Sequence, residues 1–136
     1  MKRLLILCFL GVGLLIGAGA TAVMAADAPP PVVSSAVVYD LVGTDAAPGN
    51  AEYKGTVQLE RKDSTVIVTW NVEGETYVGT GVVDGNAMAV AYGGGDDDDE
   101  VGIGLYIRDP QTEVVTGRWT VKGKTILGTE RWTPRK

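Results

Sequence analysis

Apolar and polar side chains alternate along most of the chain, from Val37 to the last residues. A period of two is typical of strands with one buried face, whereas an amphipathic helix would repeat about every 3.6 residues. Dipeptides that favour turns separate these runs, among them Asp63-Ser64, Glu73-Gly74, Asp84-Gly85 and Lys122-Gly123. The pattern therefore predicts an all-β domain with no helix after residue 33.

These four turns also predict which residues pair across neighbouring strands. A two-residue turn sets every partner in the strands that it joins, and a one-residue slip would turn each side chain to the opposite face. The expected pairs are Leu59 with Val68, Val57 with Trp70, Gly55 with Val72, Trp70 with Tyr77, Val68 with Gly79, Val66 with Gly81, Gly81 with Met88, Gly79 with Val90, Tyr77 with Tyr92, Trp119 with Ile126 and Gly117 with Gly128. All of these residues share one face, which we interpret as the buried face of the sheet.

Two further segments complete the sheet. We expect that face to receive Val37, Tyr39 and Leu41 from a first strand, and Val101, Ile103, Leu105 and Ile107 from a later one. The buried face alternates aromatic residues with glycine, which fits side chains to a tapering barrel interior, and closure removes exposed strand edges. The sequence thus predicts a small eight-stranded antiparallel up-and-down barrel, with a β-sandwich as the alternative.

The N-terminal segment has the three parts of a secretory signal peptide. Lys2 and Arg3 precede an apolar run from Leu4 to Ala20, and small residues follow up to Ala26. An uncleaved membrane anchor is the alternative interpretation. The predicted organisation is a helical signal peptide at 1–26, a Pro-rich spacer at 27–33 and a barrel domain at 34–136. We therefore expect an exported protein, periplasmic or extracellular, that is free of the membrane once the leader is removed.

The composition excludes several kinds of chemistry. Of the 136 residues, 12 are Lys or Arg and 17 are Asp or Glu, the net charge is −5, and there is no His. Because the only Cys is Cys8, in the leader, the mature chain lacks the groups for a Cys/His zinc site, a Ser-His-Asp triad or a Cys-His dyad. An acidic chain without a basic stripe is also unsuited to binding nucleic acid. We expect no enzyme activity, no cofactor and no nucleic-acid partner.

Four segments carry a resemblance to known proteins. They are Tyr53-Lys54-Gly55-Thr56-Val57, the stretch from Val68 to Gly81, and Gly117-Arg118-Trp119-Thr120 together with Gly128-Thr129-Glu130. In these segments the chain resembles a group of small exported bacterial proteins of uncharacterised function, some of which are labelled fibronectin-binding. The expected architecture is also similar to that of avidin-type and lipocalin-type barrels. The resemblance implies an exported barrel and no particular activity.

Five aromatic residues of the buried face are candidate ligand-binding residues: Tyr53, Trp70, Tyr77, Tyr92 and Trp119. The mouth of a barrel often holds a small ligand, and these rings could line a pocket for a flat or apolar molecule. An eight-stranded barrel is only just wide enough to be filled by side chains or to hold one small ligand. Five large rings favour the filled interior, so both outcomes stay open.

Glu130 is a further candidate, because the expected register places its carboxylate on the buried face. It would lie beside Val115 near one end of the barrel. An inward carboxylate is costly unless it is paired or hydrogen-bonded, and such acids are often found at functional sites. The structural alternative is that Arg131 or Arg118 neutralises it at a wet rim.

Small and branched apolar residues gather on the opposite, outer face. They are Ile67, Val78, Val82, Ala87, Ala89 and Ala91, and the expected register places Gly102 and Gly104 beside them. A contiguous apolar patch of this kind is typical of a contact surface. The alternative is a loop or the N-terminal segment folded over it.

The most unusual segment is the acidic run Asp96, Asp97, Asp98, Asp99 and Glu100, which follows three glycines. Clustered carboxylates could bind calcium, which prefers oxygen ligands. Consecutive acids point in different directions, however, and repel one another, so a solvated loop is the favoured interpretation.

The sequence leads to two hypotheses about function. The first is an exported, non-enzymatic barrel that acts by contact, through the outer patch, with an envelope or host macromolecule or with a second copy of itself. The alternative is a carrier of a small apolar ligand in the barrel interior.

Overall fold

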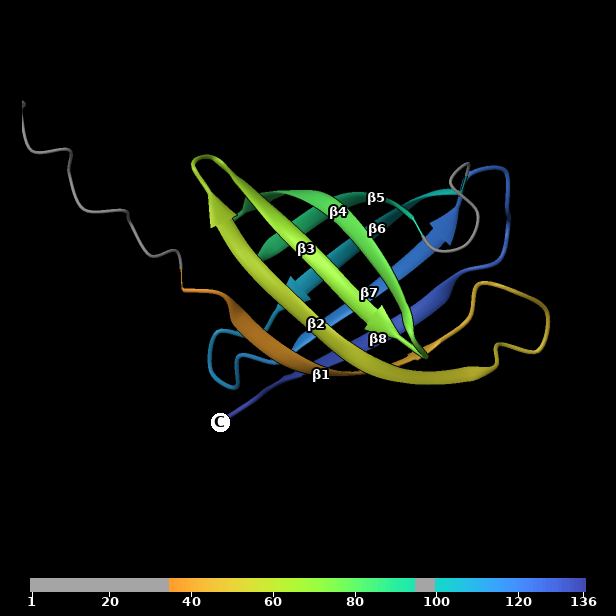
Figure 1. Ribbon diagram of the computed structural model, residues 1–136, viewed down its shortest axis with the longest axis horizontal. Coiled ribbons are helices and arrows are strands. Elements are labelled where there is room, and N and C mark those ends of the chain that lie inside the picture. Colours follow the sequence, from red (N-terminus) through yellow and green to blue (C-terminus); the bar gives the residue numbers. More distant parts are fainter. Residues whose placement is uncertain (1–34, 95–99) are drawn as a thin grey trace, which may run out of the picture. The chain divides into compact units, whose positions relative to one another are not determined.

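The barrel is closed by strand pairing around its whole circumference. The computed structural model describes residues 35–94 and 100–136. The strands are β1 (Val37–Thr44), β2 (Glu52–Lys62), β3 (Thr65–Val72), β4 (Glu75–Asp84), β5 (Ala87–Gly94), β6 (Val101–Arg108), β7 (Val115–Val121) and β8 (Gly128–Pro134). Each strand pairs antiparallel with the next, and β8 closes on β1 (Figure 1). The predicted eight-stranded up-and-down barrel is confirmed, and the β-sandwich is wrong.

The described residues contain strands, turns and irregular segments, as the sequence predicts. Among them there is no helix long and apolar enough to span a membrane. The predicted signal peptide at 1–26, the spacer at 27–33 and the four aspartates at 96–99 lie outside the described residues.

Two of the four predicted turns have the expected register. Leu59 pairs with Val68 across the Asp63-Ser64 turn, and Trp70 pairs with Tyr77 across the Glu73-Gly74 turn. Asp63 has a φ of 50° and Gly74 a φ of 90°, the left-handed values that such tight turns require. The short connections therefore fix β2, β3 and β4 as the sequence indicates.

The other two hairpins differ from the predicted register by two residues. Gly79 lies opposite Tyr92 instead of Val90, and the β4–β5 turn is centred on Gly85-Asn86. Likewise Gly117 lies opposite Glu130 instead of Gly128. A shift of two keeps every side chain on its predicted face, because side chains alternate with a period of two. The observed pairing sets a bulky side chain against glycine, which leaves room for the larger group inside the barrel.

Strand β6 is turned the other way from the prediction. Ile103 and Leu105 are exposed, at 63% and 56%, whereas Gly102, Gly104 and Tyr106 face the interior. A Cβ at Gly104 would overlap the Tyr106 ring, so the interior has space for the ring only where this strand carries glycine. Val101 and Ile107 are exposed with Ile103 and Leu105, so the predicted inward set of β6 is wrong.

Replacing Gly104 with alanine tests this orientation. We expect a loss of about 1–3 kcal/mol in the free energy of unfolding, because the added methyl group displaces the buried Tyr106 ring. Gly93→Ala is the matched control, since a Cβ there meets only an ordinary contact with the Glu100 carbonyl oxygen at 3.5 Å. Urea denaturation measures both variants. Equal stability of the two would contradict the inward placement of Gly104.

The packed core occupies the middle of the barrel and the end where the chain leaves β8. Its buried residues are Tyr39, Leu41, Val57, Val66, Val68, Trp70, Met88, Val90, Tyr106, Val115 and Trp132. Tyr106 and Trp132 pack with ring centroids 4.3 Å apart. The other end, which carries the β1–β2, β3–β4 and β7–β8 connections, is here called the open end. The aromatic rings near that end surround a cavity instead of filling the barrel completely.

Candidate ligand-binding site

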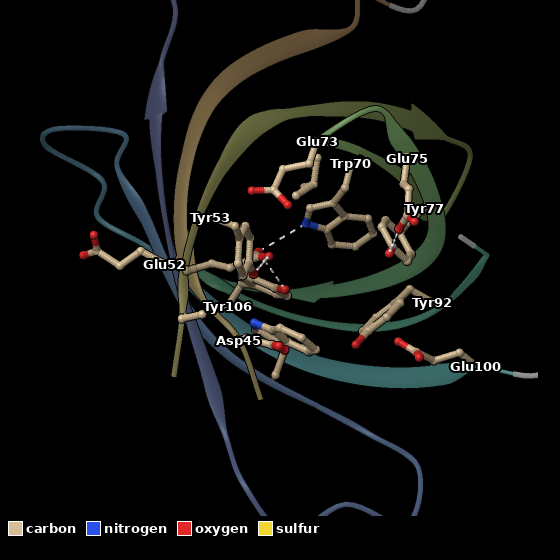
Figure 2. A pocket seen from close by; sticks show the side chains of 14 residues that line it. Asp45, Glu52, Tyr53, Trp70, Glu73, Glu75, Tyr77, Tyr92, Glu100 and Tyr106 are labelled. Atoms are coloured by element: carbon tan, nitrogen blue, oxygen red, sulfur yellow. Dashed lines mark hydrogen bonds between the residues drawn. The ribbon is translucent and has the colours of Figure 1, made fainter. Parts of the chain in front are cut away.

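A cavity of about 570 Å³ lies at the open end of the barrel. Ligand pockets in proteins typically enclose about 300–1,000 Å³, so a small organic molecule fits this volume. The lining residues are Asp45, Ala51, Glu52, Tyr53, Trp70, Val72, Glu73, Glu75, Tyr77, Tyr92, Glu100, Tyr106, Trp119 and Glu130. Figure 2 shows the labelled side chains arranged around this space. All six ligand-binding residues that the sequence predicts are among the residues that line this cavity.

Glu130 lies at the inner limit of the cavity and is only 8% exposed. Its Oε1 accepts a hydrogen bond of 2.6 Å from the Tyr53 hydroxyl. Its Oε2 accepts three more, from Trp70 Nε1 (3.1 Å), the Tyr106 hydroxyl (3.0 Å) and Trp132 Nε1 (2.8 Å). Four donors from four strands therefore hold one carboxylate in a fixed position.

Two glycines make this convergence possible. Glu130 lies between Gly43 of β1 and Gly117 of β7, its cross-strand partners on either side. A Cβ at Gly43 would overlap the Tyr53 ring, and a Cβ at Gly117 would overlap the Tyr106 ring. Each tyrosine lies over its glycine, and its hydroxyl reaches the carboxylate. A side chain at either position would separate Glu130 from one of its donors.

The predicted surroundings of Glu130 are corrected in two respects. It lies opposite Gly117, and Val115 instead pairs with Trp132. The side chains of Arg131 and Arg118 are exposed, and the hydrogen-bond donors to Glu130 among the described residues are aromatic. Arg131 directly follows Glu130 on β8. Because consecutive residues of a strand point to opposite faces, the Arg131 side chain points outward, away from Glu130.

Burial dominates the electrostatics of this network. Removal from water raises the pKa of Glu130 above its ordinary value, and the four hydrogen bonds act in the opposite direction. Burial and the nearby Glu130 charge also raise the pKa of Tyr53 and of Tyr106 above that of free tyrosine. Both hydroxyls therefore keep their protons at neutral pH and act as donors to the carboxylate.

The remaining aromatic rings surround the cavity in contact with one another. The centroids of Trp70 and Tyr92 are 5.7 Å apart, those of Tyr92 and Trp119 are 6.1 Å apart, and those of Tyr53 and Trp119 are 6.3 Å apart. The Tyr77 hydroxyl donates a hydrogen bond to Glu75. The Tyr92 hydroxyl is buried and has no hydrogen-bond partner among the described residues. Trp119 Nε1 is likewise buried and without a hydrogen-bond partner among the described residues.

Acidic side chains surround the entrance to the cavity. They are Asp45, Glu52, Glu73, Glu75 and Glu100, here called the acidic rim. They come from the connections and strand ends at the open end. Figure 2 shows Glu73, Glu75 and Glu100 beside the aromatic rings, whereas the Glu52 side chain points away from them. The sequence analysis did not identify Asp45, Glu52, Glu73 or Glu75 as site residues. All of them lie at the same end of the predicted barrel, and this shared position is the signal that could have identified them.

The fifth member of the rim, Glu100, entered the sequence analysis as a candidate calcium ligand. The structure places it beside the cavity, whereas its neighbours at 96–99 lie outside the described residues. Among the residues that are described, no group of three or more Asp, Glu, His or Cys side chains could hold a metal ion.

The predicted partner surface lies on the outside of the barrel. Val78 and Val82 are 50% and 63% exposed, and Ala89 and Ala91 are exposed beside them. Gly102 and Gly104, expected next to this surface, face the interior instead. Ile103 and Leu105 take their place and make the surface larger and more apolar.

Together, the fold and the cavity define a small closed antiparallel barrel that is open to solvent at one end. No protein-family model matches the chain, and no curated protein matches it.

Proposed function

We propose that this chain is an exported, non-enzymatic binding protein that takes a small organic molecule into the open end of its barrel. The observation that carries the proposal is the cavity of about 570 Å³, whose walls are aromatic and whose inner limit is Glu130. Small-ligand sites are mostly apolar or aromatic, with a few polar groups that fix the orientation of the ligand. The N-terminal leader pattern supports export.

The site is preorganised, which favours binding. The hydrogen bonds to Glu130 fix Tyr53, Trp70 and Tyr106, all of which line the cavity. Rings that are already held in place lose little conformational entropy when a ligand binds.

The residue types in the cavity support binding without chemistry. Among the described residues, the lining consists of Asp, Glu, Tyr, Trp, Val and Ala, so the hydroxyl, thiol and amine nucleophiles of Ser, Thr, Cys and Lys do not belong to it. The buried carboxylate of Glu130 is held in a fixed position by four donors. These features support a site that holds its ligand unchanged.

Native mass spectrometry after mild purification tests the proposal. We expect an adduct of small mass that is released on denaturation, together with a change in tryptophan fluorescence, since Trp70 and Trp119 line the cavity. Ala51→Trp, which places an indole at the entrance, is expected to abolish the adduct. Ala47→Trp in the same connection is the control, because Ala47 is outside the lining. A protein without adduct that binds none of the probes described below would overturn the proposal.

A second candidate function rests on the outer apolar face. Its members are Val78, Val82, Ala87, Ala89, Ala91, Val101, Ile103, Leu105 and Ile107, contributed by β4, β5 and β6. None of these side chains is charged, so two acidic copies could meet here without placing like charges in contact. The alanine row of β5 would let the two sheets approach closely. We propose a second copy of the chain as the partner.

Ala89→Glu tests this self-association. The substitution would set two carboxylates against each other across a twofold interface, and we expect the dimer to weaken at least about tenfold. Thr133→Glu is the control, because Thr133 is exposed on β8, away from the outer apolar face. Sedimentation velocity over a range of concentrations measures the effect. A protein that is monomeric at every concentration would exclude this candidate.

A further inference from the structure

We propose that the ligand of the open end is an organic cation, an ammonium or guanidinium group attached to an apolar or aromatic body. This inference rests on the proposed function and names the chemical class of the molecule bound. Three independent features of the site support it: the sign of its charge, the nature of its walls and the hydrogen-bonding capacity left at its inner limit.

The charge around the cavity is of one sign. All five members of the acidic rim are carboxylic acids, and no Lys or Arg belongs to the described lining. Ion pairs among the described residues join Glu60 to Lys62, Glu113 to Arg108 and Asp40 to Arg135, none of which lines the cavity. A cleft that carries charge of one sign between low-dielectric walls concentrates its field in the opening. The field attracts cations and repels anions.

The walls are suited to a cation that also has an apolar body. A cation is attracted to the face of Trp or Tyr when it lies within about 6 Å of the ring centroid. Trp70, Tyr92 and Trp119 form a continuous series of tilted and edge-to-face pairs along the wall. Figure 2 shows Trp70, Tyr77 and Tyr92 around the same space as Tyr53 and Tyr106. A cation in that space meets several rings at once.

The carboxylate of Glu130 retains an acceptor for a donor group. Glu130 Oε1 accepts one hydrogen bond, from Tyr53, whereas Oε2 accepts three. A carboxylate oxygen has about two lone-pair directions, so Oε1 can accept another N–H. An ammonium or guanidinium group, which only donates, matches this acceptor.

The same observations favour an organic cation over a metal ion. Hard metal ions need several oxygen ligands that converge within about 2.0–2.6 Å of one point. Among the described residues no three acidic groups converge in this way. The rim carboxylates surround a wide space instead, which fits a diffuse organic charge better than a small ion.

Titration calorimetry with three probes of nearly equal size tests the inference. The probes are 2-phenylethylammonium, neutral 2-phenylethanol and anionic phenylacetate. We expect the ammonium to bind at least about tenfold more tightly than the alcohol, and phenylacetate to bind least. Raising the salt concentration to about 0.5 M should weaken the ammonium complex and leave the alcohol complex unchanged.

A pair of substitutions in the rim connects this preference to named residues. Glu73→Gln with Glu100→Gln removes two rim charges, and we expect about a 3- to 10-fold loss of ammonium affinity with unchanged binding of the alcohol. Asp84→Asn with Glu113→Gln is the matched control, because it removes the same charge from exposed residues at the other end of the barrel. The control should bind the ammonium as the unsubstituted protein does.

The outcomes separate this inference from the proposed function. Equal affinity for all three probes, or a preference for phenylacetate, would overturn the cationic ligand and leave a binding barrel in place. An equal loss of ammonium affinity in both double variants would show that net charge, and not the rim, sets the preference, which also overturns it. Failure of every probe, combined with the absence of a native adduct, would overturn the proposed function itself.

Discussion

Replacing Glu130 with leucine is expected to lower the free energy of unfolding by about 3–6 kcal/mol. Leucine has similar bulk but accepts no hydrogen bond. A buried donor that loses its acceptor costs about 1–3 kcal/mol. Three buried donors lose their acceptor in this variant, namely Trp70 Nε1, the Tyr106 hydroxyl and Trp132 Nε1. Tyr53, at the cavity, can turn to water. Urea denaturation followed by tryptophan fluorescence measures the change.

Glu130→Gln and Arg131→Gln are the comparisons for this effect. Glutamine keeps one oxygen that can accept the three buried donors, so its cost should be about 1 kcal/mol or less. Arg131 is the exposed neighbour on the same strand, and its replacement should change stability by no more than about 0.5 kcal/mol. A leucine variant as stable as the glutamine variant would contradict a structural role for the four hydrogen bonds.

The contribution of Glu130 to stability is expected to decrease as the pH rises above 4.5, its ordinary pKa. Burial raises the pKa of Glu130 in the folded protein, and the hydrogen bonds it accepts only partly oppose the increase. The folded state therefore binds this proton more tightly than the unfolded chain. The resulting stabilisation is complete below the unfolded pKa and is lost as the pH rises through the folded pKa. The slope can reach about 1.4 kcal/mol per pH unit.

Glu130→Gln isolates this effect from the other acidic residues. Unfolding free energies of both proteins, measured from about pH 4 to about pH 8, should diverge, with the unsubstituted protein losing stability relative to the variant. The other carboxylates are common to both proteins, so their contributions cancel in the difference. Parallel pH profiles would show that the carboxyl has the same proton affinity in the folded and unfolded states, which would contradict the prediction.

The cavity residues show how far a local pattern can lead. The inward orientation of Tyr53, Trp70 and Trp119 could be predicted, because strand alternation assigns each residue to a face. That Glu130 would be inward followed from the same rule. Its four donors could not be predicted, since they come from β2, β3, β6 and β8, and only the closed barrel brings those strands around one carboxylate.

Strand β6 shows where the pattern misleads. By hydrophobicity alone, Ile103 and Leu105 are better core residues than Gly102 and Gly104. The interior instead needs space for the rings of Tyr92 and Tyr106, which a Cβ at either glycine would overlap. Space inside a closed barrel is limited by all eight strands together, so one strand cannot reveal which of its faces is inward.

The sequence by itself determined the strands, their antiparallel order, and the tight turns at Asp63-Ser64 and Glu73-Gly74. These properties follow from residues close to one another in the chain, through side-chain alternation and turn geometry. The tertiary structure alone decided the orientation of β6, the two-residue shifts, the network around Glu130 and the acidic rim. Those properties depend on ring volumes and charges that meet only after the strands have closed around a common interior.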